Sequence, residues 1–443
     1  DDNYILHFKK SSGGFFHNVA VTTADDSLTT FDTCAEIAGS DSQGIVGSAL
    51  VFNNWLYDCA NTAGDNGSLA SVGGLSGTAG NPDLDNNFAA QAAAAVTDQA
   101  LDWAAINAAY PESVADVDYL DSTRYIGAVN PLSSTLPWWA DWTIEGSLGT
   151  APSAPEATCP AGAPANSDGL CVLPSTIGAD MTLNGGVDYL MEGRVTVGNG
   201  NGNIRVDGKL ESGSDVQNVT LTIEPGVKVY GKSGTFANLL ITRCSKFMAE
   251  GTATAPIIFS SDDEGYEGAG EWGGLIIHGY GLHNTCTGAD VCNVDAEGES
   301  GRAGGFVRED NSGVLRYVVV AEGGYEFAPD NEINGISLVG VGSGTTMEYI
   351  QVEGNSDDGI EFYGGDVNVK YGVFTNNLDD SVDWDEGYQG NLQYIIVKQS
   401  NAGGGEAFEM DTQGAAEPLS KPTVANLTIV ASKRADDCLL YTS

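Results

Sequence analysis

Two kinds of short apolar segment alternate between residues 176 and 437. One kind reads Met347-Glu-Tyr-Ile-Gln-Val-Glu, and the other reads Gly359-Ile-Glu-Phe-Tyr-Gly-Gly. Segments of one kind recur about every 22 residues where no loop intrudes, which is the self-similarity of a solenoid coil. A single coil cannot bury its inward side chains, whereas stacked coils share one core and pair their backbone groups. The pattern predicts an all-β fold, a right-handed parallel β-helix over residues 176–443, with an antiparallel sandwich as the alternative.

Successive coils of such a solenoid should carry equivalent residues at equivalent places. Tyr349, Tyr371 and Tyr394 hold the same position in three consecutive segments of the first kind. We therefore expect these tyrosines to line up from coil to coil, together with the inward aliphatic side chains.

The charge of the chain restricts its partners. Lys and Arg total 18 against 61 Asp and Glu, which gives a formal net charge of -43. A surface this acidic repels the phosphates of nucleic acid, so no nucleic-acid partner is expected. The chain has no apolar run of about 18 residues, so no membrane span is predicted either. The carboxylates form either a solvated acidic surface or a set of calcium sites.

The densest carboxylates stand in the turns before segments of the second kind. Equivalent turns of stacked coils lie about 4.8 Å apart, so carboxylates of two coils could share one calcium ion. The other interpretation is a ladder of Asn and Asp side chains that satisfies the backbone of the turns. Glu361 and Asp366 lie nearby, and two further candidates are residues 262–264 with Glu267 and residues 330–332. The predicted calcium ligands are Asp357, Asp358, Asp379, Asp380, Asp383, Asp385 and Glu386.

The two ends of the chain read as parts of one pattern. Asp436-Asp437 follows an apolar segment at 425–430, and Asp1-Asp2 precedes Tyr4-Ile-Leu-His-Phe. Residues 1–45 are therefore predicted to be coils that stack after residue 437 of the same chain or of a neighbouring one. Three arrangements are open: a permuted chain, a piece of a tandem array, or strands donated to the next molecule in a head-to-tail filament.

The remaining segments differ in kind. Residues 46–150 are predicted to be a small, helix-containing flanking region, because residues 86–109 are Ala-rich with helical spacing. Residues 151–175 are predicted to be a linker.

Cysteine spacing predicts disulfides, which form in an oxidising, extracellular compartment. Cys244 is expected to be a buried, unpaired residue, and residues 438–443 resemble a translated sequencing adapter. The predicted pairs are Cys159 with Cys171, Cys286 with Cys292, and Cys34 with Cys59.

Several longer motifs resemble a family of secreted bacterial β-helix surface proteins common in marine and Bacteroidetes-type genomes. They include Leu221-Thr-Ile-Glu-Pro-Gly-Val, Glu271-Trp-Gly-Gly-Leu-Ile-Ile and Asp357-Asp-Gly-Ile-Glu-Phe-Tyr-Gly-Gly. The resemblance covers residues 176–437 and implies an extracellular or cell-surface location without an established reaction. In that family a segment similar to the one that starts at Tyr125 follows the last coils, whereas here it precedes them. This departure agrees with a permuted or tandem arrangement.

The favoured function is an extracellular structural or adhesive element that is stabilised by calcium. Its partners would be further copies of itself, end to end, or a cell-surface glycan. Paired aspartates on a β-helix are also typical of polysaccharide hydrolases and lyases, so a polysaccharide-active or glycan-binding protein is the alternative. The Gly-His-Gly and Arg-x-Lys patterns of pectin-cleaving enzymes are missing, and His278-Gly-Tyr-Gly is the nearest approach. No catalytic residue is predicted.

Overall fold

The structure of the chain is a computed structural model. It describes residues 4–8, 14–23, 33–37, 50–57, 77–79, 120 and 159–432, except 264, 287–289, 297, 327–332, 402 and 414–415. The helix expected over residues 86–109 and Cys59 of the third expected disulfide lie outside these residues. The described residues include no helix long and apolar enough to cross a membrane.

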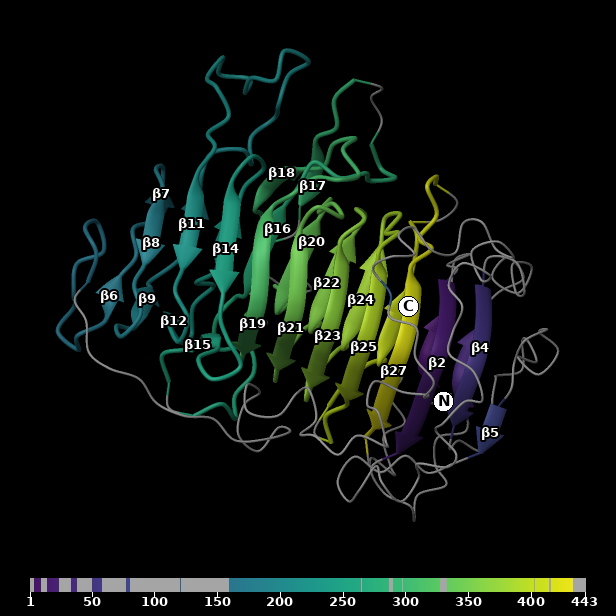
Figure 1. Cartoon of the computed structure of the whole chain (residues 1–443). Helices are drawn as coiled ribbons and strands as arrows, with labels where there is room; N and C mark the ends of the chain where they lie inside the picture. The colour runs from purple at the N-terminus through teal and green to yellow at the C-terminus, as the bar shows by residue number, and fades with distance from the viewer. Residues whose placement is uncertain are drawn as a thin grey trace.

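Parallel strands stack coil upon coil into a right-handed β-helix, as the sequence pattern predicts (Figure 1). The first sheet holds one short strand from each coil. In spatial order its strands are β7 (Thr176–Ile177), β10 (Val195–Val197), β13 (Leu239–Ile241), β16 (Leu275–His278), β20 (Ile336–Val339), β22 (Ile360–Tyr363), β24 (Val382–Asp385), β26 (Phe408–Met410), β1 (Tyr4–Phe8) and β3 (Thr33–Ile37).

The second sheet holds the longer strands of the coils. Its main path is β6 (Cys171–Val172), β9 (Tyr189–Met191), β12 (Lys228–Gly231), β15 (Ile257–Ser261), β19 (Gly313–Ala321), β21 (Thr346–Glu353), β23 (Asn368–Thr375), β25 (Asn391–Lys398), β27 (Thr423–Ala431), β2 (Gly14–Thr23), β4 (Leu50–Tyr57) and β5 (Gly77–Ala79). A branch consists of β8 (Met181–Leu183), β11 (Thr220–Ile223) and β14 (Lys246–Glu250), and a separate hairpin consists of β17 (Val294–Ala296) and β18 (Gly301–Ala303).

Strand β19 is the point at which the branch joins the main path. Its first half pairs with β14 and its second half with β15, and Tyr317 between the halves has a φ of 49°. In each of β19, β21, β23, β25 and β27, one residue with positive φ bends the strand in the middle. These bend residues are Tyr317, Tyr349, Tyr371, Tyr394 and Asn426.

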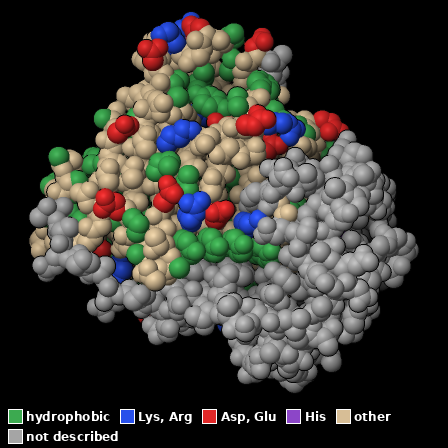
Figure 2. All heavy atoms as spheres, in the orientation of Figure 1, with side chains coloured by type: hydrophobic (Ala, Val, Ile, Leu, Met, Phe, Trp, Pro, Cys, Tyr) green, Lys and Arg blue, Asp and Glu red, His purple; other side chains and the backbone are tan. Residues whose placement is uncertain are grey.

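The bend tyrosines form a stacked column. Ring centroids of successive tyrosines from Tyr317 to Tyr394 are 4.3, 4.4 and 4.9 Å apart. The equivalence of Tyr349, Tyr371 and Tyr394 is thus confirmed, but Tyr349 and Tyr371 are partly exposed at the bend instead of lying in the core. Figure 2 shows a band of hydrophobic side chains across these strands, with acidic and basic side chains beside it.

The core is a column of apolar side chains inside the coils. Side chains alternate across a strand, so every second residue of the first sheet points inward. Parallel pairing places these residues in register from coil to coil. One such row, fully buried, is Ile336, Ile360, Val382, Phe408 and Leu6.

The first strands of the chain stack on its last coil. Leu6 of β1 pairs with Phe408 of β26, and Phe16 of β2 pairs with Val424 of β27. Strands β4 and β5 then continue the second sheet, although they lie inside the segment 46–150 that the sequence pattern sets apart as a flank.

A disulfide-closed loop covers the opposite end of the solenoid. Cys159 is bonded to Cys171 of β6, and the amide of Val172 donates a 2.9 Å hydrogen bond to the carbonyl of Pro164. Ala163 of the loop is fully buried against the first coil. Part of the predicted linker, residues 151–175, is therefore an ordered cap on the free edge of β6.

The other sulfur predictions have mixed outcomes. The disulfide Cys286–Cys292 is confirmed. Cys244 is unpaired as expected, but it is partly exposed and has a φ of 72°, so the expectation of a buried residue is wrong. The residue lies in the turn between β13 and β14.

Candidate metal centre

The turns that lead into the first sheet carry a column of carboxylates. Asp358, Asp380 and Glu406 each precede by two residues a member of the paired row Ile360, Val382 and Phe408. They therefore occupy one position on three successive coils, and we call them the acidic column. All three are buried, with Asp358 only 8% and Asp380 only 2% exposed.

Hydrogen bonds link the acidic column from coil to coil. The amide of Asp380 donates to Oδ1 of Asp358 at 3.0 Å, and the amide of Glu406 donates to Oδ1 of Asp380. One oxygen of each aspartate thus satisfies the backbone of the next turn. This is the ladder that the sequence offered as the alternative to a calcium site, and it still leaves the second oxygen of each carboxylate for other contacts.

A second row of carboxylates lies on the first sheet itself. Glu361 of β22 is paired in register with Asp383 of β24. Both alternate with core residues along their strands, so they project from the opposite face of the sheet. Both are also buried, and Nδ2 of Asn334 donates a 2.6 Å hydrogen bond to Glu361.

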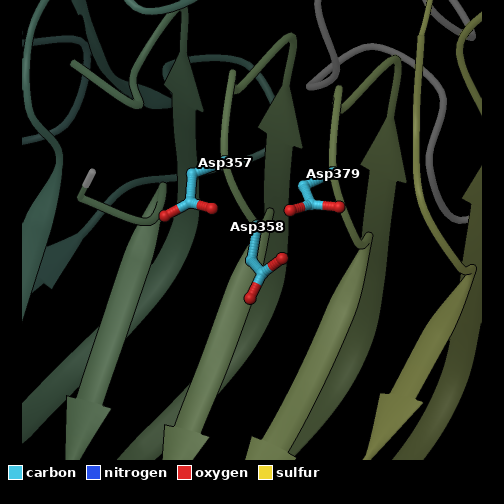
Figure 3. A group of neighbouring side chains, drawn as sticks. All are labelled: Asp357, Asp358 and Asp379. Atoms are coloured by element: carbon cyan, nitrogen blue, oxygen red, sulfur yellow. The ribbon is translucent and has the colours of Figure 1, made fainter. Parts of the chain in front are cut away.

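The two rows meet at Asp358. Carboxylate oxygens of Asp357, Asp358 and Asp379 lie within 4.8 Å of one another, and so do those of Asp358, Glu361 and Asp383. Figure 3 shows Asp358 between Asp357 and Asp379, which come from neighbouring turns. We call these sets the turn triad and the sheet triad.

The spacing and chemistry of both triads fit a hard divalent cation. Oxygens that bind one calcium ion at about 2.3–2.6 Å are at most about twice that distance apart. All ligand atoms are carboxylate oxygens, which calcium prefers, and each triad draws on two coils.

Burial and neighbouring like charges together shape the electrostatics of the acidic column. Burial raises the pKa of Asp358 well above its usual value, and the neighbouring Asp380, Glu361, Asp383 and Asp357 raise it further. Burial also raises the pKa of Asp380, followed by the effect of Glu406 and two aspartates. Burial and like charges therefore disfavour the ionised form of these carboxylates, and a cation among them would favour it.

The structure places three of the predicted ligands outside the triads, namely Asp380 of the acidic column, Asp385 and Glu386. The carboxylate of Glu386 contacts Nε2 of His283, from the loop after β16. Asp385 accepts the amide of Glu386 at 2.6 Å, and burial, with Asp411 nearby, raises its pKa to about 6. Asp366, expected near the site, pairs with Arg308.

The structure also adds Glu406 to the acidic column, and Glu361 belongs to the sheet triad although the sequence placed it only nearby. The signal for Glu406 was present in the chain, because Glu406-Ala-Phe-Glu-Met-Asp is a segment of the second kind.

The other carboxylate candidates lead to a different group. Glu264 and residues 330–332 lie outside the described residues, and Asp262, Asp263 and Glu267 are exposed. Near them, Glu322 is buried, and its pKa is raised to about 7, chiefly by burial and also by Glu271 and Glu267. Glu271 accepts a hydrogen bond from the hydroxyl of Ser261.

His278, the nearest approach to a pectin-cleaving motif, is packed in the interior. Its ring is 1% exposed, and Nε2 lies 2.9 Å from the hydroxyl of Ser300. Burial lowers the pKa of His278 to about 3, which keeps the imidazole neutral. His278 is therefore a buried, neutral residue that packs inside the fold.

The fold and the acidic column define a parallel β-helix protein with a line of carboxylates along one set of turns. The chain belongs to the family of pectate-lyase-like β-helix domains, whose profile matches residues 191–439, more than half of its length. The match runs from β10 to β27 and includes every residue of both triads. The chain matches no curated protein and no solved structure.

Proposed function

We propose that the protein is an extracellular structural β-helix in which calcium joins neighbouring coils at the turn triad and the sheet triad. The observation that carries the proposal is the position of Asp358, which both triads share. It is buried between coils, and burial together with four neighbouring carboxylates raises its pKa. A cation there would offset the repulsion and hold two coils in register.

The disulfides support an extracellular location. Cys159–Cys171 closes the cap and Cys286–Cys292 closes a loop beside the first sheet. Disulfides of this kind persist in oxidising compartments. The excess of carboxylates is also consistent with an extracellular medium rich in divalent cations, because the negative charge keeps the chain soluble and attracts counter-ions.

Calcium binding is tested by isothermal titration and by thermal unfolding in calcium, magnesium and chelator. Saturating calcium at about 100 times Kd should stabilise the fold by about 2.7 kcal/mol, and magnesium by less, because magnesium requires a smaller and stricter geometry. Asp379→Asn should weaken binding, since Asp379 belongs to the turn triad. Asp385→Asn is the matched control, because Asp385 has a raised pKa but lies outside both triads. Equal midpoints in calcium and chelator, with no heat of binding, would remove the metal from the proposal.

A polysaccharide-active protein is the second candidate, favoured by membership of the pectate-lyase-like family. Glu361 and Asp383 project from the outer face of the first sheet. A bound polysaccharide could contact them there if it displaced the side chains that now bury them, such as Asn334. The test is incubation with acidic and neutral polysaccharides, with reducing ends and ultraviolet absorbance as readouts. Product formation that Glu361→Gln abolishes and Glu386→Gln preserves would favour this candidate over the structural one.

The structural proposal includes a partner, either a cell-surface glycan or further copies of the chain end to end. Glycan binding is measured by affinity electrophoresis in gels that contain the polysaccharide. Slower migration in the polysaccharide gel without product formation would indicate a glycan-binding protein. If chelator abolishes this slower migration, glycan binding depends on the metal at the triads.

A further inference from the structure

One segment runs along the axis of the solenoid instead of around it. This segment, residues 279–285, follows β16, and we call it the strap. The amide of Gly279 donates to Val339 at 2.9 Å, and the carbonyl of Leu282 accepts from Gly365 at 2.7 Å. Val339 ends β20 and Gly365 follows β22, so the strap crosses one coil after another.

The far end of the strap reaches two more coils. The amide of Asn284 donates to Glu386, after β24, at 2.9 Å. Its side-chain Nδ2 donates to Thr412, after β26, at 3.0 Å, and lies 3.4 Å from the carbonyl of Pro418. His283 beside it is buried and pairs with Glu386. The strap thus connects β16 with coils that have no direct pairing with it.

The coils are shaped to receive the strap. Gly364 and Gly387 lie at the crossings with φ of 64° and 92°. A Cβ at Gly364 would lie 2.7 Å from the carbonyl oxygen of Leu282, and one at Gly387 would lie 3.2 Å from Cβ of Asn284. Gly364 therefore allows a close approach of the strap backbone that a Cβ would prevent, and a Cβ at Gly387 would crowd Asn284.

Both ends of the strap are anchored. The amides of Gly304 and Val307, on the return path of the loop, donate to Gly279 and Tyr280 at 3.0 and 2.8 Å. Cys286, directly after the strap, is bonded to the buried Cys292. The carbonyl of Cys292 accepts a 3.1 Å hydrogen bond from the guanidinium of Arg243, which follows β13.

In an ordinary solenoid each coil contacts only its neighbours, so coils at an end can open without the rest. We propose that the strap couples the coils of β16 to β26 into one cooperative unit, and that the disulfide Cys286–Cys292 is a redox-sensitive lock on it. A dithiol reductant would give up two electrons and two protons, become a cyclic disulfide, and leave Cys286 and Cys292 as two thiols. The end of the strap then loses its covalent tie to the hairpin that Arg243 holds.

Hydrogen exchange measured peptide by peptide tests the proposal on the full chain in chelator, so calcium binding does not enter the readout. In Cys286→Ser/Cys292→Ser, amides of β22, β24 and β26 should exchange together about tenfold faster than in the wild type, while β10 and β13 keep their protection. Cys159→Ser/Cys171→Ser is the matched control and should affect only β6 and its neighbours.

A second variant keeps the disulfide and removes the contact with the last coils. Asn284→Ala should speed exchange of β26 more than that of β20, because Asn284 bonds only the later coils. Mild reduction of the folded wild type should reproduce the effect of the double cysteine variant, even if that variant folds poorly. Unchanged exchange of β22 to β26 in Asn284→Ala and in the reduced protein would overturn the proposal, as would a change confined to the strap.

Discussion

The amide of Asp380 donates a hydrogen bond to the carboxylate of Asp358, the residue at the same position on the preceding coil. Each of these aspartates therefore supports the backbone of the next turn, while burial and neighbouring carboxylates raise its pKa. The arrangement stabilises the turn through one oxygen and destabilises it through its charge. A cation or a proton changes the balance between the two effects.

Replacement of Asp358 by Asn should therefore have opposite effects with and without metal. In chelator we expect Asp358→Asn to raise stability by about 1–3 kcal/mol, because a buried charge disappears while Oδ1 still accepts the amide of Asp380. Asn334 holds the equivalent position one coil earlier, so the turn tolerates an asparagine. In calcium the variant should be less stable than the wild type, since both triads lose a ligand. Chemical unfolding followed by circular dichroism measures both, and a variant that is weaker in chelator too would contradict the expectation.

The metal-free protein should be more stable in mild acid than at alkaline pH. Burial raises the pKa of Glu322 to about 7 and that of Asp366 and Asp385 to about 6. A carboxyl whose pKa is higher in the folded state favours folding below its unfolded pKa, and this contribution is lost as the pH rises through the folded value. The thermal unfolding midpoint, measured in chelator, should decrease as the pH is raised from about 4.5 to about 8. Glu322→Gln should reduce the decrease of the midpoint near pH 7. A midpoint that rises with pH across this range would contradict the raised pKa values.

The tyrosine column should contribute measurably to stability. Tyr371 stacks on Tyr349 and on Tyr394, so its loss removes two ring contacts, worth about 1–3 kcal/mol together. Tyr371→Asn keeps a residue that tolerates positive φ, as Asn426 does at the equivalent bend, and isolates the stacking effect. Tyr371→Val should cost about 1–2 kcal/mol more, because a β-branched residue is strained there. Equal stability of the two variants would show that the bend imposes no strain.

The cap should keep the β6 end from pairing with other molecules. Cys159→Ser/Cys171→Ser frees the loop that covers β6, and an open parallel edge recruits further strands. We expect the variant to form more dimers or longer assemblies through this end than the wild type, measured by mass photometry and electron microscopy. Filaments formed by the capped wild type would contradict the role of the cap and would support end-to-end association.

Most of the fold follows from local sequence because each coil repeats one pattern. Alternation of apolar residues assigns inward faces, and the recurrence of segments aligns Ile360, Val382 and Phe408. The same alignment brings Asp358 and Asp380 together and extends the pattern to β1, whose Leu6 continues the row. Register in a stacked solenoid is a short-range property, so the sequence carries it.

The composition of the site depended on contacts that no repeat encodes. His283 contacts Glu386 and Arg308 pairs with Asp366. Both contacts form because the long loop after β16 runs along the axis and brings these side chains to distant coils. Tyr349 and Tyr371 lie partly exposed at the bends of their strands instead of in the core, where the backbone has a positive φ. The sequence by itself determined which residues share a position from coil to coil. Only the tertiary structure decided which of them face a partner from elsewhere in the chain, because loop paths depend on packing between residues more than a hundred positions apart.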